Sequence, residues 1–315
     1  MAGFAQGSRS RLTIAAESSF GVLPTSPTFA ELPKRSHSLD LTKERVTGDD
    51  IRADRMQDID RHGNRTVTGS IETNLRRGDY DLLLESAFFN TFDTNDHLTI
   101  GTTPRFMRLE DSALDILQYR QFAGCLVNSA TFNIAPNQMV QTTFDIVGRN
   151  MVQAQSSISG SPTAPSGFEP FDSFNGALLE GGVGTNDDLC IVSALQFSIT
   201  NNVTPAHVIL CEDNRDQAAQ MQFGMATIEG TMTVYYEDET LIDKFLDETP
   251  SQLSITVDDP TEANGYTFFM PRVKYNGASV PVANPQSRFI ELPFVALKGP
   301  SGNPFSLRLT RTSGT

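Results

Sequence analysis

The sequence predicts a mainly β protein built from two tandem domains, each a β-sandwich or barrel with one flanking α-helix. Three observations lead to this prediction. Apolar and polar residues alternate with a period of two along much of the chain, as in strands with one face on a core and the other in water. An amphipathic helix interrupts the strands in each half. The same order of elements recurs about 160 residues later, as from Gly69 to Gly230.

The alternation is clearest in four segments of the first half. In each of them one set of alternate residues is apolar, and the other set is hydroxyl, amide or acidic. An antiparallel sheet with one solvated face produces this pattern, so we expect each segment to form a strand of such a sheet. The four segments are residues 38–46, 67–75, 126–134 and 140–147.

A helix is predicted between the second and third of these strands. Its apolar stripe at helical spacing consists of Tyr80, Leu83, Leu84, Ala87 and Phe88. Asp79 stands just ahead of the stripe, where its carboxylate can accept N–H groups of the first turn as a cap.

The second half repeats the order and spacing of the predicted elements of the first half more closely than it repeats their residues. The matched segments are 38–46 with 195–200, 67–75 with 227–236, the helix with 238–248, and 130–149 with 278–299. An internal duplication explains this agreement. The alternative is that any two antiparallel β-domains share such a rhythm.

Composition places the boundaries between the halves. Residues 153–188 are rich in Ser, Gly and Pro, which is typical of a linker. We therefore expect a first β-domain over residues 1–152, a linker over 153–188 that leads into the second domain, and a second β-domain over 189–315.

The balance of charge argues against a direct nucleic-acid binder and, taken alone, indicates solubility. The chain carries a net charge of -14, of which residues 1–155 contribute −3 and the remainder −11, whereas such a binder is normally basic. No apolar run reaches the length of a membrane span, and the first residues do not form a signal peptide. We expect a soluble protein made in the cytoplasm, without a membrane partner.

No catalytic or cofactor motif is found in the sequence. Four histidines are scattered without metal-ligand spacing, and zinc, phosphate-loop and serine-hydrolase motifs are absent. Cys125, Cys190 and Cys211 are odd in number and dispersed, so we expect reduced thiols in or near the core. The sequence thus predicts a protein that is not an enzyme and holds neither a cofactor nor a metal.

Residues 43–65 form a long charged excursion between two predicted strands, and residues 203–225 are its less charged counterpart. Its acids alternate with arginines and lack the glycine of a calcium loop, which favours ion pairing over metal binding. Long connections are usually functional or disordered. The excursion is thus either a solvated loop or an arm that contacts other subunits or rings. The arm residues are Asp49, Asp50, Arg52, Asp54, Arg55, Asp58 and Arg61.

Several stretches of the chain resemble the tail tube proteins of siphophages, in the group with long, two-domain chains. They are residues 15–32 (AAESSFGVLPTSPTFAEL), the stretch from DDIRADRMQDIDRHGNRTVTGSIETNL to the YDLLLESAF helix, FDSFNGALLEGG, CIVSALQFSITNN and IEGTMTVYY. The resemblance covers most of the chain, although each motif is loose. It implies β-sandwiches with a flanking helix, assembled into rings that stack into a tube.

The solvated face of the predicted strands suits the lining of such a tube. A wide barrel with this alternation has a water-filled interior, and a lining without Lys or Arg does not hold DNA phosphates. Any solvated sheet face would share part of this pattern. The residues that we expect to face the lumen are Asp40, Thr42, Ser70, Glu72, Asn74, Thr131, Asn133, Gln141, Thr143, Asp145, Gln196, Ser198, Glu229, Thr231 and Thr233.

The resemblance implies a structural protein of the virion tail, assembled in the host cytoplasm and polymerised as a conduit for genome delivery. With two domains per chain, we favour a pseudo-sixfold ring of three subunits. The alternative is a hexamer with the second domain outside. Expected partners are further copies of the chain, a tape measure protein, the tail terminator and distal tail proteins, and passing double-stranded DNA. Competing functions are another tail component, such as a terminator or baseplate protein, a β-sandwich binding module, and a hydrolase with an unrecognised site.

Overall fold

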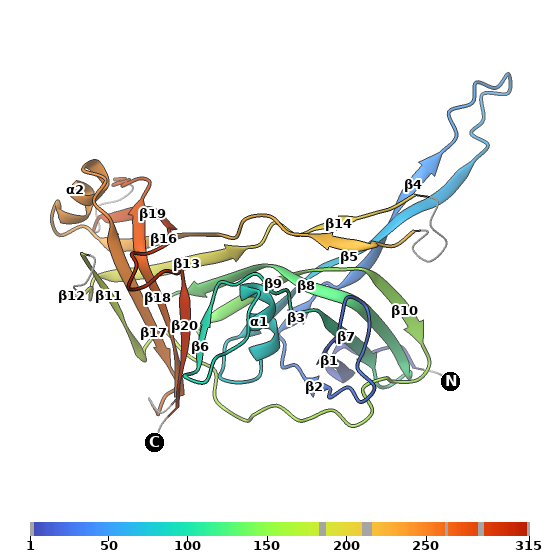
Figure 1. Ribbon diagram of the computed structural model, residues 1–315, viewed down its shortest axis with the longest axis horizontal. Coiled ribbons are helices and arrows are strands. Elements are labelled where there is room, and N and C mark those ends of the chain that lie inside the picture. The colour runs from blue at the N-terminus through green and yellow to red at the C-terminus, as the bar shows by residue number, and fades with distance from the viewer. Residues whose placement is uncertain (1–2, 183–186, 210–215, 262–263, 283–286, 314–315) are drawn as a thin grey trace.

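A computed structural model describes residues 3–182, 187–209, 216–261, 264–282 and 287–313. The described chain is mainly β, as the sequence predicted, with strands that form one 18-stranded network and a separate two-stranded hairpin. Figure 1 shows an elongated molecule in which the two halves lie end to end and a long hairpin extends away from the body.

The first half contains ten strands, a short 3-10 helix and helix α1. They are η1 (Gly7–Arg9), β1 (Ser10–Ala16), β2 (Ala30–Glu31), β3 (Ser36–His37), β4 (Asp40–Thr47), β5 (Asp60–Asn74), α1 (Asp81–Phe88), β6 (His97–Thr99), β7 (Met107–Ala113), β8 (Gln118–Ile134), β9 (Gln141–Gly148) and β10 (Asn150–Ala154).

The second half contains the remaining strands and helix α2. They are β11 (Gly176–Gly182), β12 (Asp187–Asp188), β13 (Val192–Thr200), β14 (Thr204–Ala206), β15 (Gln220–Gln222), β16 (Thr227–Tyr235), α2 (Thr240–Leu246), β17 (Ser251–Asp258), β18 (Asn264–Tyr275), β19 (Phe289–Ala296) and β20 (Arg308–Ser313).

Each strand that the alternation predicted is present, but β5 and β8 are longer than the pattern indicated. The additional part of β5, from Asp60, belongs to a hairpin arm with water on both sides, so its side chains need not alternate. The additional part of β8, from Gln118, pairs with β7 and β10 in a second layer of sheet. Beyond Cys125 the strand passes into the main sheet, where β9 is its neighbour.

The apolar stripe of α1 is buried as predicted, with Leu83, Leu84, Ala87 and Phe88 inaccessible to solvent. The prediction that Asp79 caps this helix is wrong. Tyr80 occupies the cap position, without a side-chain hydrogen bond. The carboxylate of Asp79 instead accepts the backbone N–H of Ser166, at 2.7 Å, from the segment that connects the two halves.

Both halves have the same strand order in the main sheet. The first is β4–β5–β9–β8, and the second is β13–β16–β19–β18. Gly69 and Gly230 hold equivalent places in β5 and β16. A Cβ at Gly69 would lie 2.6 Å from the Leu39 Cα, and one at Gly230 would lie 2.6 Å from the Gln196 carbonyl oxygen. Both strands therefore need glycine for the close approach of the preceding strand.

The two halves join through strand pairing, which we call the seam. Residues 129–134 of β8 pair antiparallel with residues 195–200 of β13, so the main sheet continues from one half into the other. Phe132 of β8 stacks on Phe197 of β13, with ring centroids 4.9 Å apart, and lies equally close to Phe268 of β18. One core therefore spans both halves. The domain boundaries at 152 and 188 remain predictions.

The connection between the halves lies along the first half and does not cross open solvent (Figure 1). We call residues 155–175 the strap. Its Ser157, Ile158 and Ser159 donate hydrogen bonds to the carboxyl group of Glu110, a fully buried residue of β7. Further along, Phe171 is buried in the shared core. These contacts hold the strap in one course until β11 begins.

The cysteines differ in part from the prediction of core thiols. Cys125 is buried, and burial raises the pKa of its thiol far above the ordinary value. Cys190 is exposed, because it lies in the turn before β13 and not within the strand. Both are free thiols. Cys211 lies outside the described residues.

Candidate functional site

The fifteen residues predicted to line a lumen lie on one face of the main sheet, which we call the polar face. Directly opposed residues of antiparallel strands point to the same side, and the ladder connects the fifteen in rows. One row contains Glu72, Thr143, Thr131, Ser198 and Glu229, on five neighbouring strands. The row crosses the seam, so both halves contribute to one continuous surface.

The polar face is solvated over its whole width. None of the fifteen residues is buried, whereas the intervening residues of the same strands form the core. The core face is covered by α1 and by the second layer of β1, β7 and β10, which leaves the polar face as the open side of the sheet. Partial burial raises the pKa of Asp145 on this face above its ordinary value.

The face also includes residues that the sequence did not single out. Thr68 lies opposite Asp40, and Glu291 lies opposite Thr233. Both follow the same alternation as their neighbours, so the period-two pattern contained the signal. Glu291 adds a carboxylate to the second half of the face, where it is exposed.

The first arm, residues 43–65, is a β-hairpin whose two strands are the outer parts of β4 and β5. Its tip, residues 48–59, carries six of the seven predicted arm residues, and Arg61 pairs with Val46 in the ladder. Arg52 bridges Asp58 at 2.6 Å and Asp54 at 3.2 Å, and its hydrogen bond lowers the pKa of Asp54.

Large apolar side chains are exposed on the first arm beside these charges. Ile51 is fully exposed, and Met56 is 67% exposed. The second arm, residues 203–225, similarly exposes Ile209 and Met225. Exposed apolar residues gathered on a projecting element are typical of an interaction site, which favours a contacting arm over a solvated loop.

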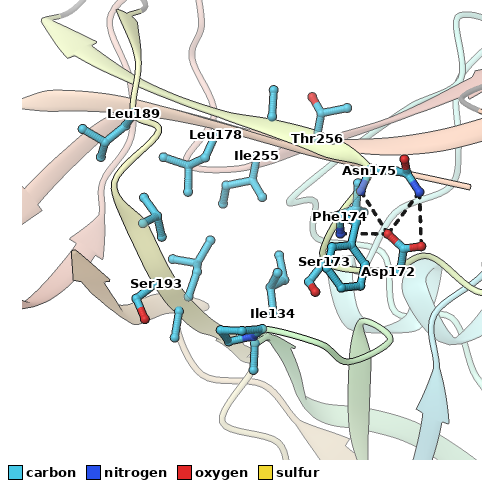
Figure 2. A pocket seen from close by; sticks show the side chains of 18 of the residues that line it. Ile134, Asp172, Ser173, Phe174, Asn175, Leu178, Leu189, Ser193, Ile255 and Thr256 are labelled. Atoms are coloured by element: carbon cyan, nitrogen blue, oxygen red, sulfur yellow. Dashed lines mark hydrogen bonds between the residues drawn. The ribbon is translucent and has the colours of Figure 1, made fainter. Parts of the chain in front are cut away.

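A pocket of about 470 Å³ lies where the strap, the seam and β17 meet. Figure 2 shows Leu178, Leu189 and Ile255 lining one part of it and Ile134 another, with the hydrogen bonds of Asp172 to residues 174 and 175 at its edge. Cys190 also lines it, and a hydrogen bond with Asp188 raises the pKa of this thiol. A nucleophilic thiol needs the opposite shift, so the pocket offers no activated nucleophile.

The described residues contain no group of three or more His, Cys, Asp or Glu side chains that could hold a metal ion. Within the same ranges, no helix has the length and apolarity to cross a membrane. The polar face is an organised surface of hydroxyl, amide and carboxylate groups that crosses both halves, and it is suited to contact with water or a passing solute.

Comparison with known proteins identifies the family. The family model of the phage tail tube protein matches residues 7–296, nearly the whole chain. The chain therefore belongs to the phage tail tube proteins, a structural family and not an enzyme family, and its place is the tail of the virion. No curated protein matches it.

Proposed function

We propose that this tail tube protein closes into rings of three subunits, and that the stacked rings form the conduit of a long-tailed, siphovirus-type phage. The observation that carries the proposal is the seam, because it joins two equivalent halves edge to edge within one chain. A second seam of the same kind, formed between chains, would extend the sheet into a closed barrel.

Both strand edges needed for that second seam are open among the described residues. On one side, β4 pairs only with β5. On the other, residues 277–282 continue β18 and approach β19 through Ser279, which exchanges two backbone hydrogen bonds with Glu291. Their outer edge corresponds to the edge of β8 that β13 occupies. Unpaired strand edges readily accept another chain.

The seam within the chain supplies the register for the seam between chains. It pairs Ile199 with Ala130, and the residues at the same places in the other halves are Leu41 and Ala278. The backbone N–H of Leu41 is bonded to the side chain of Asp40, which occupies the place of the missing strand. We therefore expect Leu41 to pair with Ala278 of the next copy.

Three copies are the natural number for closure of this sheet. Each chain contributes eight strands to the main sheet, so three chains give a barrel of roughly 24 strands. At a spacing of about 4.8 Å, that barrel has a backbone diameter of at least about 37 Å, wide enough for a DNA duplex. A hexamer with the second half outside is disfavoured, because the seam holds both halves in one sheet.

The polar face suits the inside of the barrel. The second layer and α1 lie on the opposite side, where the larger circumference has room for them. Hydroxyls, amides and the carboxylates of Asp40, Glu72, Asp145 and Glu229 would then line the channel. Such a lining repels phosphate and gives DNA no counterion release on contact, so the duplex passes without binding.

This role needs no catalysis or cofactor. Its partners are further copies of the chain, a tape measure protein inside the tube during assembly, terminator and distal tail proteins at the ends, and the passing DNA. A terminator, a baseplate component or a binding module does not require a polar face that continues across two halves, so the tube is the function best supported.

Electron microscopy of the purified protein tests the ring directly. We expect closed rings or tubes with a central channel and threefold symmetry in class averages. Sixfold symmetry with density outside the ring would contradict the subunit number. Particles that remain monomeric at every concentration and salt condition would contradict assembly through the open edges.

Reversing charge on the polar face should slow the passage of DNA. Replacing Glu72, Asp145 and Glu229 with lysine leaves the core and both seams untouched but places cations where DNA phosphates pass. We expect tubes to form normally and the DNA ejection rate to fall, more so at low salt, because about one counterion is released per phosphate contact. Ejection kinetics of the variant phage provide the measurement.

A matched variant replaces three exposed acids away from this face, Asp115, Glu169 and Glu239, with lysine. It changes the net charge equally and should leave ejection unchanged. Equal rates for the two variants would show that the polar face does not line the channel.

A further inference from the structure

The second arm docks on the first half through an apolar contact beside the seam. Val203 and Met221 of the arm are buried against Phe89, at the end of α1, and Leu126 of β8. Phe223 adds an edge-to-face contact with Phe89, with ring centroids 5.1 Å apart. The contact is apolar and buried, and it lies between elements far apart in sequence.

A hydrogen bond fixes the root of the same arm. The backbone N–H of Val203 donates to the Asn128 side-chain oxygen at 2.7 Å. The backbone N–H of Asn201 donates to the Asn128 carbonyl oxygen at 2.8 Å. Asn128 is the bulged residue of β8, so the arm is held at a defined point of the sheet.

The two strands of the first arm pair in the same register as the two strands of the second arm. Thr204 pairs with Gln222 in the second arm, and Val46 pairs with Arg61 in the first. Gln222 and Arg61 precede the equivalent glycines by the same number of residues. The residues of the first arm at the places of Val203 and Met221 can therefore be named without ambiguity.

Those residues are Arg45 and Asp60. They are paired with each other, with 2.8 Å between Nε and Oδ2, and more than half of each side chain is exposed. The first arm thus presents an ion pair where the second arm presents two buried apolar side chains. In Figure 1 this arm extends away from the rest of its own chain.

The second arm docks on a patch made of Phe89 and Leu126, which we call the docking patch. Between the halves this patch also changes from apolar to charged residues. Phe89 and Glu248 each follow a helix in a left-handed conformation, with φ near 52°. The backbone N–H of the following residue, Asn90 or Thr249, donates to the carbonyl oxygen five residues earlier, which is that of Glu85 or Lys244. The helix ends are therefore equivalent, and Glu248 stands in the place of Phe89.

Lys274 stands in the place of Leu126. Leu126 pairs with Val147 on β9, and Lys274 pairs with Val295 at the corresponding place on β19. Lys274 and Glu248 form an ion pair, with 2.8 Å between Nζ and Oε2. An apolar patch in the first half is thus replaced by a charged patch in the second.

We propose that the first arm of one chain docks on the second half of the next copy, where Arg45 and Asp60 meet Glu248 and Lys274 in a cluster of four charges. The proposal rests on the ring described above and specifies the contact at its seam. Asn276, exposed at the place of Asn128, supports it because the residue that fixes the arm root is the same in both halves.

The two contacts discriminate between partners. An apolar arm on the charged patch would leave the Glu248–Lys274 pair desolvated, and a charged arm on Phe89 and Leu126 would bury its own pair without partners. Both mismatches carry a desolvation cost. Each arm therefore accepts only its own patch, so first and second halves alternate around the ring. Seams between chains should also be more salt-sensitive than the seam within a chain.

Transplanting the apolar contact tests the proposal. The arm variant is Arg45→Val with Asp60→Met, the patch variant is Glu248→Phe with Lys274→Leu, and a third variant combines all four changes. The matched control is Arg9→Val with Asp115→Met, which removes one exposed cation and one exposed anion outside both arms and the seam. Sedimentation and class averages measure ring formation as a function of protein and salt concentration.

We expect the arm variant and the patch variant each to require at least about tenfold more protein for half-assembly. The fourfold variant should assemble again and lose the salt dependence of the unsubstituted protein, and the control should match that protein. Rings that form equally well in the arm variant would overturn the docking proposal while leaving the ring in place. Failure of the unsubstituted protein to form any ring would instead refute the proposed function.

Discussion

Replacing Phe132 with alanine is expected to lower the free energy of unfolding by about 3–5 kcal/mol, the usual cost of removing a buried phenylalanine from a packed core. Phe132 is fully buried and contacts the rings of Phe197 and Phe268 across the seam. Because these rings come from both halves, the cavity weakens both at once. We therefore expect a single, shifted unfolding transition and not the separate loss of one half.

Chemical denaturation followed by circular dichroism measures this effect, since the chain contains no tryptophan. Phe174→Ala provides the control, because that side chain is 71% exposed and its loss should change stability by less than about 0.5 kcal/mol. Two transitions, of which only one moves, would show that the halves fold independently and that the seam is a contact between autonomous domains.

Proline at position 278 is expected to abolish ring formation and leave the isolated chain folded. The backbone N–H of Ala278 faces the open edge, as that of Ala130 faces β13. Ala278→Pro removes this donor and places the pyrrolidine ring of proline in the path of the approaching strand. Proline is tolerated at a free edge but not at a paired position inside a sheet. Each ring contains three such seams, so we expect more than about a tenfold rise in the concentration needed for assembly.

Ala278→Val is the control for that experiment. It adds bulk but keeps the N–H group, and valine is favourable in strands. Melting temperature monitors the fold of both variants, and light scattering monitors assembly. If the proline variant forms rings as readily as the valine variant, residues 277–282 are not the edge that joins the chains.

The sequence predicted the main sheet well, because its strands alternate between a core and water. Residues 67–75 show why, since Val67, Ile71 and Leu75 are fully buried while Ser70 and Glu72 face solvent. The same alternation predicted the fifteen residues that lie on the polar face. The side chains of each face followed from local pattern because each strand has only two faces, but the seam was needed to join them into one surface.

Other features depended on contacts that a local pattern does not contain. Asp79 has the right type and place for a cap, but the strap approaches and takes its carboxylate. The outer part of β5, from Asp60 at the arm tip, has solvent on both sides, so no alternation marked it as a strand. The seam itself joins residues 129–134 to 195–200, and neither segment indicates which edge it will meet.

The strap tethers the two halves of a chain to each other. The effective concentration of one half at the other therefore does not depend on the protein concentration. A tether of this length typically supplies a millimolar effective concentration, and its attachment to Glu110 restricts the second half further. Every other seam of the proposed ring would then form as the polypeptide folds. Only two encounters between molecules would remain, since the third seam between chains closes within the trimer. Ring nucleation should therefore depend less steeply on expression level than it would for a single-domain subunit.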